Sequence, residues 1–250
     1  MFREIQNFRA RVRLRQQPRQ HVFLITYGRS GSTLVQKILN TIPGYCIRGE
    51  NNNLLYHLFR SWAALSNCEP VQSHRRIGRS LTSEHPWFGS EQVDPDTLGR
   101  NLVSFFEREV LQPPPGTKAS GFKEIRYHQD PDRFHDFLDF MHRFFPGTRF
   151  VFNYRAHDDV MKSGWWAHQR PERVKEILDQ AETLFESYMS AHPDRCIRID
   201  YDRYAQDPSA LRPLFDFLGE AFEEGQIAQL MDARLDHLKD DKNRYAPPDP

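Results

Sequence analysis

A short segment rich in glycine and hydroxyl side chains stands between two patterned stretches of the chain: Gly28-Arg29-Ser30-Gly31-Ser32-Thr33. Before it, His21 to Thr26 has the length and apolar content of a buried strand, and after it Thr33 to Thr41 has apolar residues at helical spacing. A tight turn between a strand and a helix directs backbone N–H groups and the positive end of the helix toward one point. The segment therefore predicts a binding site for a phosphate or another anion, with Arg29 as a charged donor.

The same segment does not fit the Walker A pattern of nucleotide-dependent kinases. When Gly31 and Thr33 are aligned with the second glycine and the final hydroxyl residue of that pattern, Ser32 takes the place of the lysine and Thr26 that of the first glycine. A kinase built in this way would lack the lysine that contacts the phosphates. A kinase that uses Mg-ATP stays an alternative interpretation, as does a noncatalytic module that binds an anionic ligand.

A second junction between a strand and a helix, from Phe150 to Ser163, carries another candidate phosphate site. Arg155 stands at the end of the expected strand, and Ser163 is expected two turns along the helix that follows. Asp158 and Asp159 favour the start of that helix through capping and the helix dipole. Alone, Arg155 would be read as a surface ion-pair partner. Together with the first segment, it predicts a ligand with phosphates at two separate positions.

At these two junctions the sequence resembles the sulfotransferases that use PAPS, which is 3′-phosphoadenosine 5′-phosphosulfate. The first resembles the family's loop for the 5′-phosphosulfate, in the form found in tyrosylprotein sulfotransferases and many bacterial members, and the second resembles its 3′-phosphate motif. A third segment, Arg198 to Gly219, resembles a C-terminal region of the same family. The resemblance implies a P-loop-like fold and the transfer of a sulfuryl group from PAPS to a hydroxyl or amine acceptor, with release of PAP.

The resemblance also implies roles for individual residues. The 5′-phosphosulfate would be bound by Gly28, Arg29, Ser30, Gly31, Ser32 and Thr33, and the 3′-phosphate by Arg155 and Ser163. Tyr201 matches a tyrosine near the nucleotide, Glu50 matches the general base, and Lys123 resembles a lysine near the transferred group. Arg29 and Lys123 would act as cationic stabilisers of the transfer. The rival candidates for the base are Glu124, His128, His157 and His168.

The sequence departs from the family pattern at three places, the first of which is Arg29, where the cytosolic members carry a loop lysine. Ala156-His157 replaces the Asn-Pro that often follows the 3′-phosphate arginine, and the glycine-rich C-terminal cofactor signature of the cytosolic members is absent. The residues that cover the adenine are therefore unassigned, with Lys239 to Arg244 as a candidate segment.

These candidate residues need strands and helices that bring them together. Further strands are predicted at Tyr45 to Ile47, Ser120 to Ile125, Arg149 to Tyr154 and Cys196 to Ile199. Helices are predicted from Asn51 or Asn52 to Leu65, from Asp94 to Leu111, from Asp130 to Phe145, from Asp158 to Trp166, from Pro171 to Ala191, from Pro208 to Leu218 and from Glu223 to Met231. Strands that alternate with helices predict an α/β fold, a single domain whose central parallel sheet carries helices on both faces.

The predicted organisation has three parts. Residues 1–20 form a basic lead-in, residues 21–235 form the catalytic domain, and residues 236–250 form an irregular tail. Within the domain, residues 66–93 show little periodicity, which predicts a long loop. We expect this insertion to face the acceptor.

Composition narrows the classes of function. The chain has 34 Lys and Arg residues and 34 Asp and Glu residues, a zero net charge that disfavours a nucleic-acid-binding protein. No apolar run reaches the roughly 18 residues that span a bilayer, and the arginine-rich start lacks the apolar stretch of an export signal. The three cysteines fit a reducing cytoplasm, and neither they nor the 11 histidines show the spacing of metal ligands. The acceptor, whether a small molecule, a saccharide or a peptide, and the oligomeric state are not defined by the sequence.

Overall fold

Five short apolar runs form one parallel sheet in the computed structural model, which describes residues 20–78 and 80–231. The strands are β1 (Gln20–Ile25), β2 (Tyr45–Arg48), β3 (Ala119–Glu124), β4 (Thr148–Tyr154) and β5 (Cys196–Asp200). Their order across the sheet is β2-β3-β1-β4-β5, and all four pairings are parallel. The five predicted strands and the single α/β sheet are therefore confirmed. In this order β1 lies at the centre. The connection after β1 leads to one half of the sheet and the connection after β3 leads to the other half, so the strand order reverses beside the carboxyl end of β1. Ligands bind at such reversal points in open α/β sheets.

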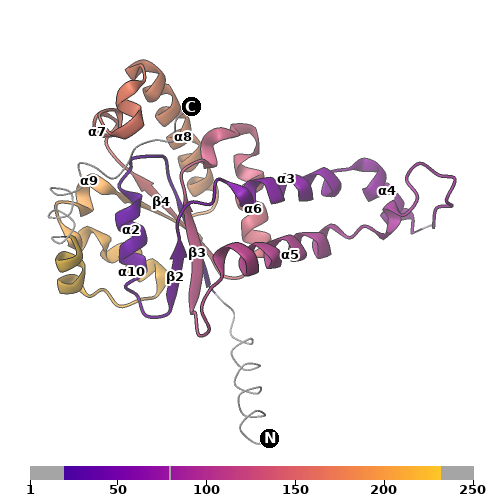
Figure 1. Ribbon diagram of the computed structural model, residues 1–250, viewed down its shortest axis with the longest axis horizontal. Coiled ribbons are helices and arrows are strands. Elements are labelled where there is room, and N and C mark those ends of the chain that lie inside the picture. The colour runs from indigo at the N-terminus through magenta and orange to yellow at the C-terminus, as the bar shows by residue number, and fades with distance from the viewer. Residues whose placement is uncertain (1–19, 79, 232–250) are drawn as a thin grey trace, which may run out of the picture.

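Helices cover both faces of this sheet (Figure 1). One face carries α2 (Ser32–Leu39), α9 (Tyr201–Tyr204) and α10 (Arg212–Leu218), and the other carries α3 (Leu54–Ser66), α5 (Pro95–Phe106), α6 (Phe134–Phe144) and α8 (Pro171–Ala191). Side chains alternate along β1. Val22 and Leu24 pack into the apolar cluster beneath α2, α9 and α10, whereas Phe23 and Ile25 pack into the cluster beneath α3, α5, α6 and α8. The central strand is thus buried on both sides, which fixes the position of its carboxyl end.

The chain between β2 and β3 forms an arm that extends away from the sheet. In Figure 1, α3 leads outward to α4 (Glu69–Ile77), and α5 returns toward the sheet. The predicted long loop at residues 66–93 is therefore wrong in part, because it contains α4 and a 3₁₀ turn at Ser90–Gln92. Only Val71 of α4 is buried, so this helix has no apolar stripe from which the sequence pattern can reveal it.

Two predicted helices change their helix type before their predicted ends. The helix expected from Asp94 continues beyond α5 as a single π-helical turn, Glu107–Leu111. The helix expected from Asp158 to Trp166 is divided into α7 (His157–Met161) and a 3₁₀ helix, Gly164–His168. Gly164 has a φ of +58°, a left-handed conformation that an α-helix cannot continue through. Ser163 therefore precedes a new 3₁₀ turn and does not lie two turns along a helix, which corrects the prediction.

Helix 224–231 closes the described part of the chain. The basic lead-in, the C-terminal tail and the candidate adenine cover from Lys239 to Arg244 lie outside the described residues. Over residues 20–78 and 80–231, none of the helices combines the length and the apolar character needed to cross a bilayer.

Candidate active site

The loop between β1 and α2 is held against the neighbouring strand β4. The Thr26 hydroxyl lies 2.7 Å from the Ser30 hydroxyl oxygen and 2.8 Å from the Asn153 carbonyl oxygen. The Asn153 side chain donates to the Ser30 carbonyl at 2.9 Å and accepts from the Tyr204 hydroxyl at 2.8 Å. These contacts are buried, so the loop is fixed before any ligand binds. A fixed loop orients its N–H groups at low entropic cost.

Two glycines of the loop lie directly beneath aromatic rings. A Cβ at Gly28 would stand 2.3 Å from Trp165, and a Cβ at Gly31 would stand 2.1 Å from the Tyr201 ring. Gly31 also has a φ of +80° and precedes the first residue of α2, a helix with no acidic side chain in its first turn. Glycine is therefore required here for close packing and for backbone conformation, and the helix N-terminus is left electropositive.

The two predicted phosphate motifs meet through their arginines. Arg155 Nη1 donates to the Arg29 carbonyl oxygen at 2.9 Å, and Arg29 Nε donates to Ser163 Oγ at 2.9 Å. The Arg155 guanidinium carbon lies 4.6 Å from the centre of the Tyr201 ring, within cation–π range. Arg29 has a φ of +66°, a conformation that costs a non-glycine residue about 1–3 kcal/mol and occurs most often at functional sites.

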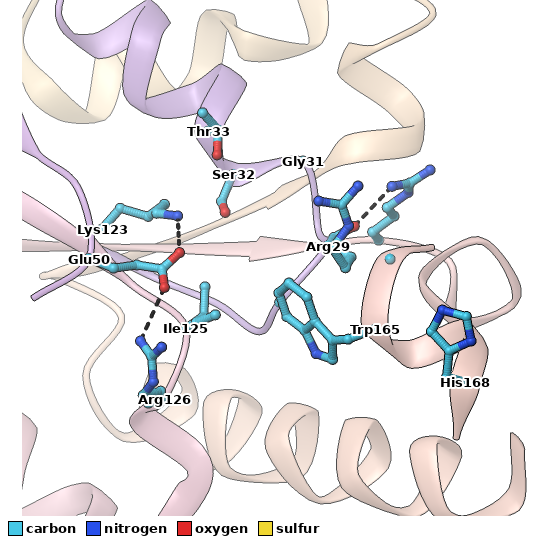
Figure 2. A pocket seen from close by; sticks show the side chains of 13 residues that line it. Arg29, Gly31, Ser32, Thr33, Glu50, Lys123, Ile125, Arg126, Trp165 and His168 are labelled. Carbon is cyan, nitrogen blue, oxygen red and sulfur yellow. Dashed lines mark hydrogen bonds and ion pairs between the residues drawn. The ribbon is translucent and has the colours of Figure 1, made fainter. Parts of the chain in front are cut away.

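A second group of charged side chains lies across the cavity, at the ends of β2 and β3. Lys123 Nζ lies 2.6 Å from one Glu50 carboxylate oxygen, and Arg126 Nη1 lies 3.1 Å from the other (Figure 2). The Lys123 side chain is 8% exposed and that of Glu50 is 32% exposed, so the carboxylate keeps contact with the cavity. Two cations thus hold the Glu50 side chain in one orientation.

Glu124 lies behind this pair and is fully buried. Its carboxylate accepts hydrogen bonds from the backbone N–H of Asn53 at 2.8 Å, from that of Asn51 at 3.3 Å and from Arg126 at 2.6 Å. These donors tie the turn after Glu50 to the end of β3. The Glu124 carboxylate therefore stabilises this turn and does not line the cavity.

The rival histidines occupy different environments. Burial lowers the pKa of His128 to about 4, and His157 lies 3.0 Å from the Glu182 carboxylate. Within residues 20–78 and 80–231, His168 is the single one of the four rival bases that lines the cavity. Figure 2 shows it at the end opposite Glu50, with Trp165 between them.

The cavity that these elements enclose has a volume of about 820 Å³. It brings together most of the predicted site: Gly28, Arg29, Gly31, Ser32, Thr33, Glu50, Lys123 and Arg155. Three predicted residues do not line it. Ser30 is buried inside the loop with its hydroxyl at Thr26, whereas Ser163 and Tyr201 contact the two arginines from behind.

Besides the rival base His168, the cavity is lined by four residues that sequence reasoning missed: Ile125, Arg126, Gly164 and Trp165. Arg126 and Ile125 directly follow the end of β3, and this position was the one available signal for them. Trp165 and Gly164 reach the cavity only because the second motif turns back at Gly164. Among the side chains that the structure describes, no cluster of three or more His, Cys, Asp or Glu residues is arranged to hold a metal ion.

Residues 21–224 match the model of a family described as the sulfotransferase family. The chain belongs to this family. Among solved structures, the sulfotransferase is similar to the sulfotransferase domain of the Synechococcus PCC 7002 olefin synthase, with 20% identity and a TM-score of 0.51 over 83% of this chain and 76% of that one. It also aligns with the sulfotransferase STF9 of Mycobacterium avium, with 13% identity and a TM-score of 0.42 over 98% of this chain and 74% of that one. No curated protein sequence matches the chain. The similarity to the olefin synthase sulfotransferase domain confirms the expected P-loop-like sulfotransferase fold.

Proposed function

We propose that this sulfotransferase transfers a sulfuryl group from PAPS to a hydroxyl or amine acceptor and releases PAP. The observation that carries the proposal is the single cavity in which the two anion-binding motifs face the Glu50–Lys123 pair. Arg29 and Arg155 give one half of the cavity the positive charge that a nucleotide with two phosphate groups needs. The other half contains the Glu50 carboxylate.

The residues present fit the proposed donor. Gly28 to Thr33 would bind the 5′-phosphosulfate through the loop N–H groups, the start of α2 and the hydroxyls of Ser32 and Thr33. Arg155 would bind the 3′-phosphate, because it lines the cavity and its guanidinium carries five N–H donors, of which one on Nη1 donates to the Arg29 carbonyl. Ser163 would act here by holding Arg29, and Tyr201 by supporting the Arg155 guanidinium.

The chemistry that we assign to this site is an in-line displacement at sulfur, with PAP as the leaving group. Glu50 would accept the proton of the acceptor hydroxyl or amine, which general bases do to accelerate such transfers by about 10²–10⁴-fold. A carboxylate has about four lone-pair positions, and Lys123 and Arg126 occupy two on Glu50, so acceptor sites remain. Lys123 and Arg29 would neutralise negative charge that grows during the transfer.

The acceptor is proposed only as a class: a small molecule, a saccharide or a peptide. Residues 66–93 remain our prediction for an acceptor-facing segment, although no described residue of this segment lines the cavity. A role there would therefore need an acceptor that extends from the cavity to the arm. We further expect the enzyme to work in the cytoplasm, because Cys46, Cys68 and Cys196 are free thiols.

A direct test is the release of labelled PAP from labelled PAPS in the presence of a panel of phenols, sugars and tyrosine peptides. We expect transfer to at least one acceptor, and stabilisation of the protein by PAP in a thermal-shift assay. Stabilisation by Mg-ATP but not by PAP would replace the proposal with a kinase. Stabilisation by PAP without transfer to any acceptor would favour a noncatalytic module that binds anions.

A further inference from the structure

A buried tyrosine hydroxyl joins the two phosphate motifs at a point that no substrate reaches. Tyr27 ends the stretch that leads from β1 to Gly28, and its side chain is fully buried. Its hydroxyl oxygen accepts the backbone N–H of Arg155 at 2.9 Å and lies 2.7 Å from the Glu182 carboxylate. A phenol has one proton, and the charged carboxylate is a stronger acceptor than the Arg155 carbonyl at 3.0 Å. The hydroxyl therefore accepts from Arg155 and donates to Glu182.

The long helix α8 fixes the direction of this hydroxyl. Glu182 lies within α8, and His157 Nε2 lies 3.0 Å from its carboxylate. Burial and the neighbouring Glu182 charge raise the pKa of Tyr27, so the phenol keeps its proton. With its proton committed to Glu182, the oxygen lone pairs of Tyr27 face the N–H of Arg155.

The backbone at Arg155 depends on such side chains because the sheet no longer supports it. Strand β4 ends at Tyr154, so Arg155 lies just beyond the ladder. The next N–H, of Ala156, donates to the Asp202 carboxylate at 2.6 Å. Tyr27 and Asp202 thus hold two consecutive peptide N–H groups and set the direction in which the Arg155 side chain leaves the backbone.

We propose that Tyr27 is a positioning residue for the 3′-phosphate of the donor, acting through the backbone of Arg155. The inference rests on the proposed function, because it takes Arg155 as the 3′-phosphate ligand. Without the hydroxyl, the Arg155 N–H loses its partner, and the guanidinium no longer faces the cavity in one fixed orientation. The loss falls mainly on the 3′-phosphate, because the loop keeps its buried contacts through Thr26 and Asn153 when its one contact with the Arg155 side chain, at the Arg29 carbonyl, is weakened.

A thermodynamic cycle tests this separation. The Tyr27→Phe variant removes one oxygen atom, and calorimetry compares its affinity for PAP with its affinity for adenosine 5′-monophosphate, which lacks the 3′-phosphate. We expect the Kd for PAP to rise about tenfold and that for adenosine 5′-monophosphate to change by less than about twofold. In turnover assays, the KM for PAPS should rise while kcat at saturating PAPS stays near the wild-type value.

Two further variants keep the test decisive. Glu182→Ala removes the acceptor that orients the hydroxyl without changing the core ring, and it should weaken PAP selectively in the same way. Tyr188→Phe is the matched control: it removes another buried hydroxyl, which lies 3.0 Å from Asp139, and should lower the Tm without changing PAP affinity. Equal losses for both nucleotides, or unchanged PAP affinity in Tyr27→Phe and Glu182→Ala, would overturn the inference. Failure of the wild-type enzyme to bind PAP would instead refute the proposed function.

Discussion

Replacing Gly31 by alanine tests whether binding in the cavity depends on the close contact between the anion loop and the Tyr201 ring, which lies against Arg155. A Cβ at this position would stand 2.1 Å from Cδ2 and 2.3 Å from Cε2 of Tyr201. Carbon atoms that are not bonded do not approach so closely, so either the loop or the ring must move. The Tyr201 ring lies 4.6 Å from the Arg155 guanidinium, and a shift of the ring therefore displaces the cation as well.

The stability cost can be separated from the effect on binding. Gly31 has a φ of +80°, and a side chain in the left-handed region costs roughly 1–2 kcal/mol. For a domain of this size, that range corresponds to a Tm decrease of about 2–8 °C. Displacement of Tyr201 adds to this cost, and a 1 Å misplacement of positioning groups reduces turnover by about 10²-fold. We therefore expect a Tm decrease at or above this range, at least tenfold weaker PAP binding, and turnover reduced by about 10²-fold.

The matched control is Gly78→Ala. Gly78 has a φ of +65°, and apart from its chain neighbours no heavy atom of the described residues lies within 4 Å of a Cβ placed there, so this variant carries the conformational cost alone. Calorimetry with PAP and thermal melts of both variants separate the two effects. We expect Gly78→Ala to lose stability and keep wild-type PAP affinity. If Gly31→Ala also bound PAP normally, the steric argument about Tyr201 and Arg155 would be refuted.

Three further predictions address the charged groups. Glu50→Gln should lower kcat by about 10²-fold or more and leave the Kd for PAP unchanged in calorimetry; near-normal turnover would remove Glu50 as the base. Lys123→Ala should mainly lower kcat, whereas Arg155→Ala should weaken PAP binding by about 10–100-fold, the usual worth of a charged hydrogen bond, and the reverse pattern would contradict both assignments. Burial lowers the pKa of His128 from 6.5 to about 4, so the unfolded chain binds a proton that the folded chain does not between these values. Stability should therefore fall by up to about 3 kcal/mol as the pH drops through this window, and urea melts of His128→Gln should show a smaller dependence on pH.

The strands and most helices could be predicted because each is a continuous stretch of sequence in which apolar residues follow the pattern of one type of secondary structure. The strands are buried apolar runs between turns, and α8 follows its amphipathic pattern from Pro171 to Ala191. Helix α4 could not be predicted, since one buried side chain gives no stripe. The position of Ser163 was predicted wrongly because a single glycine, Gly164, interrupts a helical pattern through its backbone and not through its hydropathy.

The candidate site divides in the same way. The residue types of the loop and of Arg155 indicated an anion site, because their chemistry is local to each junction. The 2.6 Å contact between Glu50 and Lys123 joins residues 73 positions apart, so it depends on β2 and β3 being neighbours in the sheet. Trp165 enters the cavity for a similar reason, since its position against Gly28 follows from the packing of two separate junctions. Contacts of this kind follow from topology, which one sequence does not contain.

The strand order β2-β3-β1-β4-β5 has a consequence for how such an enzyme can diversify. The proposed donor ligands follow β1 and β4, whereas Glu50 follows β2 and Lys123 lies near the end of β3, on the other side of the central strand. The arm inserted between β2 and β3 begins only a few residues after Glu50 (Figure 1). Exchanging this insertion would change the segment that follows Glu50, the proposed base, and leave the proposed donor ligands untouched, because no described residue of α3, α4 or α5 lines the cavity. The proposal therefore divides the protein into two parts that can be engineered separately: the proposed donor site, and the half of the sheet from which the arm extends.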